Sequence, residues 1–185
     1  MFSKQVVSNR ALTAIGGVLP GFSAKSYQRI VGANTRINVA LVGVNSRGRA
    51  LAVNFANQSN CHISYIADVD SRAIDKCIAA VAKIHDEMPR GERDFRRLLD
   101  NREVDALVMA TPDHWHTPGT LLACQAGKHV YVEKPVSTTP HEGDLLRRAK
   151  AKYPDIVIQI GNQRRSWPNV LAAIQEVHEI GRAHV

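Results

Sequence analysis

Short apolar runs alternate with amphipathic segments along most of the chain from residue 36 onward. The runs are largely apolar instead of alternating strictly with polar residues, which is typical of strands that are buried on both faces of a parallel sheet. The predicted strands cover residues 37–43, 61–67, 106–110, 130–132 and 156–160.

The segments between these runs carry apolar residues at helical spacing. In one of them, Ile74, Ile78 and Val81 recur close to i, i+4 and i+7. Gly127 ends another of these helices, whereas residues 89–93 are polar and break the pattern. The predicted helices cover residues 47–57, 71–87, 95–99, 114–126, 140–152 and 168–179.

Strands that alternate with helices predict an α/β fold with a doubly wound, mainly parallel sheet. Right-handed crossovers place the carboxyl ends of all strands at one edge of such a sheet, where ligands bind. A length of 185 residues suits one domain with a sizeable core. The cysteines Cys61, Cys77 and Cys124 include no C-x-x-C pair, so we expect buried thiols and neither a disulfide framework nor a zinc site.

The formal net charge of +7 raises nucleic acid as a partner. The arginines are scattered over several segments, however, and no basic helix is interleaved with stacking aromatic residues. Solvated faces and a few anion contacts explain the charge more simply, so no nucleic-acid partner is predicted. No apolar run reaches the roughly 18 residues that a membrane span needs, and no span is predicted.

The first predicted strand runs into Gly43-Val-Asn-Ser-Arg-Gly48, a G-x-G-x-x-G dinucleotide fingerprint whose middle glycine is replaced by Asn45. Gly43 would form the tight turn, and Gly48 would let the following helix pack on the strand. The N-terminus of that helix would offer N–H groups to a pyrophosphate. Glycine turns before helices are common, so the motif needs support from the rest of the chain.

Two acidic residues follow the second predicted strand. Asp68, at the end of that strand, is placed to accept hydrogen bonds from both hydroxyls of an adenosine ribose, and its charge would repel a 2′-phosphate. The sequence therefore favours NAD over NADP as the cofactor. The alternative is that these acids only cap the next helix, and we assign that capping to Asp70 because its register suits it.

The strand that ends at residue 110 is followed by Thr111-Pro-Asp-His-Trp-His116. His114 and His116 lie at i and i+2, so a helix would point them to different sides, and no third ligand stands at zinc spacing. We therefore predict no metal site. This segment is instead expected to form one wall of a cofactor cleft, with Asp113 as a possible cap.

The next predicted strand ends in Glu133-Lys134-Pro135, at the same edge as the glycine turn and Asp68. Charges that would be unstable inside the sheet can face a polar ligand there. The proline restricts the backbone where those side chains must be aimed. A surface Glu–Lys pair is the alternative, but the position at a strand end favours contact with a cofactor or substrate.

The combined signature A-T-P-D-H-W-H and A-C-Q-A-G-K-H-V-Y-V-E-K-P resembles that of the Gfo/Idh/MocA oxidoreductases, relatives of glucose–fructose oxidoreductase and inositol dehydrogenase. The resemblance covers about residues 36–179. It implies a Rossmann domain that binds NAD, followed by a C-terminal α/β domain that forms the substrate site and usually the oligomer interface. The expected partner is a small sugar or polyol, and the full-length parent is expected to be a homo-oligomer.

The resemblance also assigns roles to individual residues. Lys134 would contact the substrate and be catalytic, because an ammonium near the reacting oxygen stabilises a developing alkoxide and can relay its proton. Asn162, Gln163 and Arg164 would bind sugar hydroxyls or the cofactor, unless the arginines there are simply solvated. The expected cofactor contacts are Gly43, Asn45, Arg47 and Gly48 at the pyrophosphate, Asp68 at the adenosine ribose, Thr111, Pro112 and His116 beside the nicotinamide, and Glu133 at the nicotinamide ribose.

Both ends of the chain differ from the Rossmann domain expected over residues 36–179. Residues 180–185 stand where the family's second domain would begin, so that domain and its catalytic histidine are expected to be missing and the chain is interpreted as truncated. Residues 1–35 resemble the leader of exported bacterial oxidoreductases, a Tat-like leader in which Arg10 stands alone instead of twin arginines. The alternative is a loosely docked N-terminus on a cytoplasmic protein.

Three functions remain open at this point. The chain can be the NAD(P)-binding domain of a sugar or polyol oxidoreductase that transfers hydride between a carbohydrate hydroxyl and nicotinamide. It can belong to an NAD-dependent glycosidase of the same family, which oxidises its substrate only transiently. The third reading is a truncated module that binds NAD without turnover. Substrate choice would lie in the second domain, so the sequence does not separate the first two.

Overall fold

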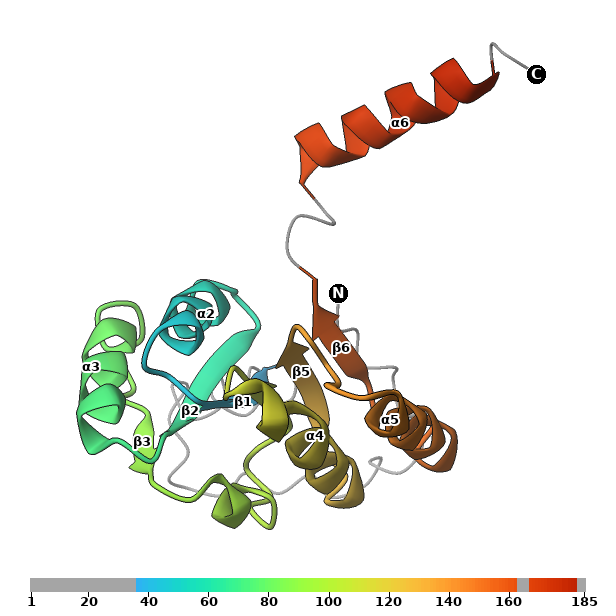
Figure 1. Cartoon of the computed structure of the whole chain (residues 1–185). Coiled ribbons are helices and arrows are strands. Elements are labelled where there is room, and N and C mark those ends of the chain that lie inside the picture. Colours follow the sequence, from blue (N-terminus) through green and yellow to red (C-terminus); the bar gives the residue numbers. More distant parts are fainter. Residues whose placement is uncertain (1–35, 163–166, 183–185) are drawn as a thin grey trace, which may run out of the picture.

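The computed structural model describes residues 36–162 and 167–182, which form a six-stranded sheet with helices on both faces (Figure 1). All strand pairs are parallel in the order β3-β2-β1-β4-β5-β6, which confirms the predicted doubly wound sheet. The strands are β1 Ile37–Val42, β2 Cys61–Ala67, β3 Arg90–Glu92, β4 Ala106–Met109, β5 His129–Glu133 and β6 Ile158–Gly161. The α-helices are α2 Arg47–Ala56, α3 Ser71–Val81, α4 His116–Gln125, α5 Pro140–Lys152 and α6 Pro168–Arg182, and the short 3₁₀ helices are η1 Phe95–Leu98 and η2 Asp113–Trp115.

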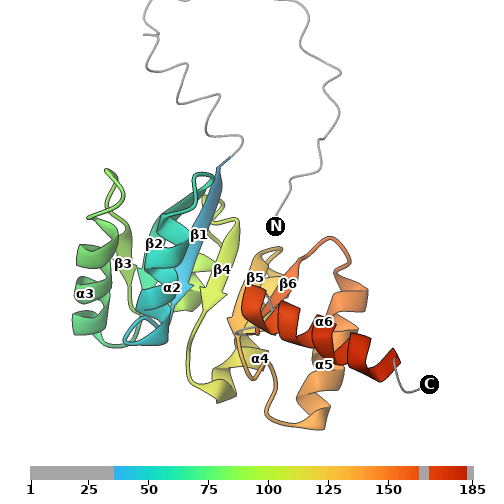
Figure 2. The same cartoon turned by 90° about the horizontal axis from the view of Figure 1, so that it is seen from above.

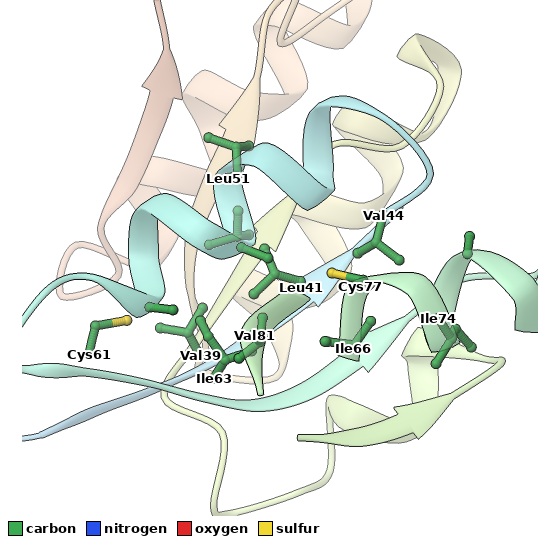
Figure 3. Packing of buried hydrophobic residues seen from close by; sticks show 14 of the residues in the cluster. Val39, Leu41, Val44, Leu51, Cys61, Ile63, Ile66, Ile74, Cys77 and Val81 are labelled. Carbon is green, nitrogen blue, oxygen red and sulfur yellow. The ribbon is translucent and has the colours of Figure 1, made fainter. Parts of the chain in front are cut away.

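Alternate residues of the central strand face two separate apolar clusters. Val39 and Leu41 of β1 belong to the cluster that includes residues of α2 and α3 (Figure 3). Ala40 and Val42 face the opposite cluster, to which β4, β5 and α4 contribute. Because both faces of the strand are covered, it carries apolar residues at successive positions, and this is why the sequence pattern predicted it.

The helix α3 is shorter than predicted, since it ends at Val81 and not near Glu87. The N–H groups of Ile84 and His85 both donate to the Val81 carbonyl oxygen and close the helix with a turn. The prediction was wrong here because no glycine or proline marks the end of the helix before Pro89.

The strand β3, which the sequence did not reveal, lies at one edge of the sheet. It has only 3 residues and pairs with β2 in the register Tyr65 to Arg90. Gly91 leaves no room for a side chain, because a Cβ there would lie 2.8 Å from Cγ2 of Ile74. Polar side chains are tolerated at a sheet edge, so this strand lacks the apolar run that predicted the other strands.

The amino edge of the sheet is closed by a buried ammonium group. Lys128 is 8% exposed, and its Nζ donates to the carbonyl oxygens of Asn101 at 2.7 Å and Val104 at 2.9 Å. Burial lowers the pKa of Lys128, and the negative charges of Asp105 and Asp100 oppose this shift. These contacts hold the start of β5 against the loop that precedes β4.

The last helix, α6, lies apart from the sheet in Figure 1 and runs to Arg182, beyond its predicted end at Glu179. It therefore crosses residue 180, where the start of a second domain was expected. Residues 1–35 with the expected leader, and residues 183–185, lie outside the described residues. Within the described ranges, no helix is long and apolar enough to cross a membrane, and no cluster of histidine, cysteine or acidic residues is suited to hold a metal ion.

Candidate functional site

The turn between β1 and α2 lies directly against the end of β4. Gly43 has a φ of 80°, and a Cβ there would lie 2.8 Å from the carbonyl carbon of Ala110 and from the amide nitrogen of Thr111. A Cβ on Gly48 would lie 1.8 Å from the carbonyl oxygen of Gly43. Gly43 is therefore required for the backbone conformation and the close approach, and Gly48 is required so that α2 can start over the turn.

The N-terminus of α2 is open to an anionic ligand. Asn45, Ser46 and Arg47 are exposed, the Ser46 side chain makes no capping hydrogen bond, and the first turn contains no acidic residue. The first N–H groups of a helix and its dipole together favour a negative charge at this position. No acidic side chain in the first turn of α2 therefore neutralises the positive end of the helix dipole.

The carboxylate of Asp68 connects the end of β2 to the glycine turn. Its Oδ2 accepts a hydrogen bond from the Val44 N–H at 2.7 Å, and its Oδ1 accepts one from the Asp70 N–H at 3.0 Å. Asp68 is half-buried, and each carboxylate oxygen can still accept a second hydrogen bond. Asp68 therefore holds the turn in place, which the sequence did not indicate.

Asp70 caps α3, which confirms the prediction. Its Oδ1 accepts a hydrogen bond from the Arg72 N–H at 2.9 Å, and the Arg72 guanidinium donates to both carboxylate oxygens. The side-chain hydrogen bond from Arg72 is the main reason why the pKa of Asp70 is lowered from its usual value. The two acids after β2 thus have separate tasks.

His116 lies behind the wall that the segment after β4 forms. It is 1% exposed, with Nδ1 2.6 Å from the Pro135 carbonyl oxygen and Nε2 2.9 Å from the Thr111 carbonyl oxygen. A neutral ring can donate to only one of these two oxygens. The prediction that His116 lines the nicotinamide side is therefore corrected: burial leaves the ring almost no surface for a ligand, and the ring joins the ends of β4 and β5 instead.

Thr111 carries a polar atom that still needs a partner. Its Oγ1 is buried and makes no hydrogen bond within residues 36–162 and 167–182. A buried hydroxyl of this kind at a strand end is readily satisfied by a ligand.

Pro112 is exposed and occupies the N-cap position of η2, so the capping role predicted for Asp113 is wrong.

The charged motif at the end of β5 contacts the start of α2, directly after the glycine turn. Glu133 is buried, and its Oε1 accepts a hydrogen bond from Arg47 Nε at 2.9 Å. Lys134 is exposed, and the peptide bond between it and Pro135 is cis. Two residues that the sequence placed in separate motifs, Arg47 and Glu133, are thus partners in one ion pair.

The loop after β6 is described only at its start. Asn162 is exposed, and its N–H donates to the Ile160 carbonyl oxygen at 2.9 Å. Gln163 and Arg164, which were predicted together with Asn162 to bind sugar hydroxyls or the cofactor, lie outside the described residues. The side chain of Asn162 is therefore at the correct edge, and its role stays a prediction.

Sequence reasoning missed Tyr131 and Gly161 at this edge. Gly161 pairs with Glu133 in the register between β5 and β6, and a Cβ on Gly161 would lie 2.6 Å from the Tyr131 hydroxyl oxygen. The available signal was the spacing of Tyr131 and Glu133, since residues at i and i+2 on a strand share one face.

Three strand ends therefore meet the turn that follows β1 and the start of α2. The turn contacts β2 through Asp68 and β4 through the backbone beside Gly43, and Arg47 of α2 contacts β5 through Glu133. Figure 2 shows the strand order that permits this, with β1 between β2 and β4 and with β5 next to β4. A glycine turn, an open helix N-terminus and an acid after the next strand define a dinucleotide-binding domain of the Rossmann class.

The family model described as "Oxidoreductase family, NAD-binding Rossmann fold" matches residues 37–160, so the chain belongs to the Gfo/Idh/MocA family, as its signature predicted. Among curated proteins, the glycosyl hydrolase family 109 protein of Saccharopolyspora erythraea is 34% identical over 151 residues, which are 80% of this chain and 33% of that protein. The alpha-N-acetylgalactosaminidase of Shewanella oneidensis is 26% identical over 110 residues, which are 57% of this chain and 24% of that protein. The chain therefore spans about a third or less of the length of these relatives.

Two solved structures have the same fold. The scyllo-inositol dehydrogenase of Lactobacillus casei, with bound NAD(H) and scyllo-inositol, matches with a TM-score of 0.70 at 22% identity over 78% of this chain and 41% of that chain. The myo-inositol dehydrogenase of Lactobacillus casei, in complex with NAD(H) and myo-inositol, matches with a TM-score of 0.70 at 21% identity over 78% of this chain and 42% of that chain. At this level of identity the likeness confirms the Rossmann fold.

Proposed function

We propose that this chain is the NAD-binding part of an oxidoreductase that transfers hydride between a hydroxyl of a sugar or polyol and nicotinamide. The observation that carries the proposal is the contact of the glycine turn and the start of α2 with the ends of β2, β4 and β5, which brings Asp68, Thr111 and Glu133 to the same edge. Membership of an NAD-binding family supports the cofactor. The inositol dehydrogenases of the same fold bind NAD(H) and a polyol, which supports the substrate class.

The residues at this edge fit a dinucleotide. Gly43 and Gly48 let the turn pack closely against β4 and under α2, the start of α2 offers N–H groups to a diphosphate, and the buried Thr111 hydroxyl needs a partner. Asp68 would receive the adenosine ribose and favour NAD over NADP by repelling a 2′-phosphate, and Glu133 would receive the nicotinamide ribose. When bound, the nicotinamide supplies the acceptor for the hydride.

Lys134 is the group that we assign to proton transfer. Its side chain is exposed directly after Glu133, the residue proposed to hold the nicotinamide ribose. Oxidation of an alcohol removes a hydride from carbon and a proton from oxygen, so Nζ near that oxygen would stabilise the developing alkoxide and relay its proton to solvent. In the reverse direction it would relay a proton to the oxygen. Asn162, with Gln163 and Arg164, would hold the remaining sugar hydroxyls.

A second candidate is a glycosidase that uses NAD for a transient oxidation. The observation in its favour is the 34% identity with a glycosyl hydrolase family 109 protein. Both candidates need the same NAD-binding edge, but the glycosidase would cleave a glycoside without accumulating NADH. In either case the proposed whole protein has a second α/β domain and is a homo-oligomer. A binding module without turnover is also compatible with a chain that spans 33% of that relative.

Titration with NADH tests the proposal on the chain itself. We expect saturable binding in the micromolar range and about tenfold or more weaker binding of NADPH, measured by cofactor fluorescence. Circular dichroism checks that the chain is folded in the same buffer. A folded chain that does not bind NADH would contradict the proposal, and equal affinities for the two cofactors would contradict the preference for NAD.

Replacing Lys134 with alanine is expected to leave NADH affinity within about twofold and to lower kcat by about a hundredfold or more, because only proton transfer is lost. Turnover is measured on a protein of the relatives' full length, as NADH formation with inositols and as release of nitrophenol from a nitrophenyl α-N-acetylgalactosaminide. Lys152→Ala, at the exposed end of α5, is the matched control. Normal turnover in Lys134→Ala would end the catalytic assignment.

A further inference from the structure

Two side chains meet at one oxygen atom of Glu133. Its Oε1 accepts a hydrogen bond from Arg47 Nε at 2.9 Å, lies 2.9 Å from Nη2 of the same guanidinium, and accepts a longer hydrogen bond from the Tyr131 hydroxyl at 3.4 Å. No side chain or backbone group among residues 36–162 and 167–182 contacts the other oxygen, Oε2, within hydrogen-bond distance. The protein therefore uses one half of the carboxylate and leaves the other half available.

The phenol of Tyr131 is fixed on two sides. Its ring meets Phe55 of α2 edge-on, with 5.5 Å between ring centroids and 79° between ring planes. On the other side lies Gly161 of β6, where a Cβ would lie 2.6 Å from the Tyr131 hydroxyl oxygen and 3.0 Å from Oε1 of Glu133. The absence of a side chain at Gly161 thus creates the space in which the hydroxyl reaches the carboxylate.

The carboxylate needs these donors because it is buried. The Glu133 side chain is 6% exposed, whereas that of its partner Arg47 is 42% exposed. A buried carboxylate without a partner is strongly unfavourable, so the ion pair with the guanidinium compensates for the lost hydration of Glu133. Burial raises the pKa of Tyr131, and the negative charge of Glu133 raises it further. The Tyr131 hydroxyl therefore keeps its proton at neutral pH and remains a donor.

The hydroxyl of Tyr131 has a task that is separable from the packing of its ring. The ring packs against the apolar cluster beside α2, and this contact needs no oxygen atom. Only the hydroxyl reaches Glu133. A phenylalanine at this position would keep the packing and lose the donor.

We propose that Tyr131 is a positioning residue for the nicotinamide half of the cofactor. Together with Arg47 it holds Oε1 of Glu133, so that Oε2 receives the ribose hydroxyls and the remaining N–H groups of Arg47 receive the adjacent phosphate. Side chains that the protein's own contacts hold in place cost less to order on binding. The inference rests on the proposed function, because it assigns the cofactor to this edge.

Replacing Tyr131 with phenylalanine is expected to weaken NADH binding about threefold to tenfold and to leave AMP binding within about twofold. AMP carries only the adenosine half, so a loss confined to NADH places the effect at the nicotinamide half. Tyr65→Phe is the matched control, because the Tyr65 hydroxyl lies in β2 and contacts Arg90 at 3.1 Å and Glu103 at 3.5 Å. This control should change neither affinity.

A second readout needs no cofactor. In ¹⁵N-correlated spectra of the chain alone, we expect the Arg47 Nε–H resonance to be shifted from those of exposed arginines and to exchange slowly with water. Glu133→Gln should move it to the position of the exposed arginines, and Tyr131→Phe should speed its exchange. A wild-type Arg47 resonance among the exposed arginines overturns the inference even if NADH binds. A shifted resonance without any NADH binding overturns the proposed function.

Gly161→Ala keeps the result interpretable if Tyr131→Phe folds poorly. The added Cβ should displace the phenol while the hydroxyl is still present, and it would also crowd Oε1 of Glu133, so the same selective loss of NADH affinity is expected. Equal weakening of NADH and AMP would indicate general damage to the fold and would overturn the positioning role. Unchanged NADH binding in both variants would overturn it as well.

Discussion

Replacing Asp68 with alanine is expected to weaken NADH binding about tenfold to a hundredfold and to reduce the preference for NADH over NADPH. The carboxylate accepts the N–H groups of Val44 and Asp70, so its loss loosens the glycine turn in addition to removing the proposed ribose contact. Loss of the negative charge also removes the repulsion of a 2′-phosphate. Fluorescence titrations with both cofactors measure the two effects.

Asp70→Ala is the control for this experiment, because it removes the cap of α3 and the pair with Arg72 while Asp68 is kept. It should lower the free energy of unfolding through the loss of this cap and leave NADH affinity unchanged. Asp68→Asn separates charge from hydrogen bonding, since an amide oxygen still accepts one N–H. It should relax the discrimination against NADPH with a smaller loss of NADH affinity. If Asp68→Ala changes neither affinity nor preference, the ribose assignment fails.

Replacing Gly48 with alanine is expected to abolish measurable NADH binding. A Cβ at this position would lie 1.8 Å from the Gly43 carbonyl oxygen, so the start of α2 must move away from the turn. The N–H groups of the helix would then no longer point at the diphosphate, and the free energy of unfolding should fall by about 2 kcal/mol or more. Cofactor titration and thermal unfolding test the two parts of this expectation.

Gly143→Ala provides the contrast. Gly143 lies within α5, and a Cβ there would lie 3.7 Å from Ser137 Oγ, which is an ordinary contact. Because alanine favours a helix over glycine, this variant should be more stable by up to about 1 kcal/mol and should bind NADH normally. A Gly48→Ala protein with wild-type affinity would show that the turn can relax and that the diphosphate binds elsewhere.

Much of the fold was predictable because the signals were local. Strands covered on both faces carry the short apolar runs from which they were predicted, and Gly127 ends α4 with a φ of 72°, as its position suggested. The position of Asp68 and Glu133 at one edge followed from the parallel direction of the strands, since right-handed crossovers place the carboxyl ends of all strands at the same edge.

Sequence analysis failed where contacts between distant segments decide the position of a side chain. His116 was treated as part of a regular helix from residue 114, but η2 intervenes and turns the ring beneath Thr111 and Pro135. The contact of Tyr131 with Glu133 depends on the empty space at Gly161 of a neighbouring strand, which no reading of one segment reveals.

The buried ammonium of Lys128 stabilises one edge of the sheet, so residues at the two edges differ in how freely they can be substituted. It binds main-chain oxygens of the loop before β4, which are present whichever side chains occupy that loop. The scaffold is thereby anchored at the rim opposite the glycine turn. Residues at the glycine-turn rim can then be exchanged while the underlying framework keeps its shape.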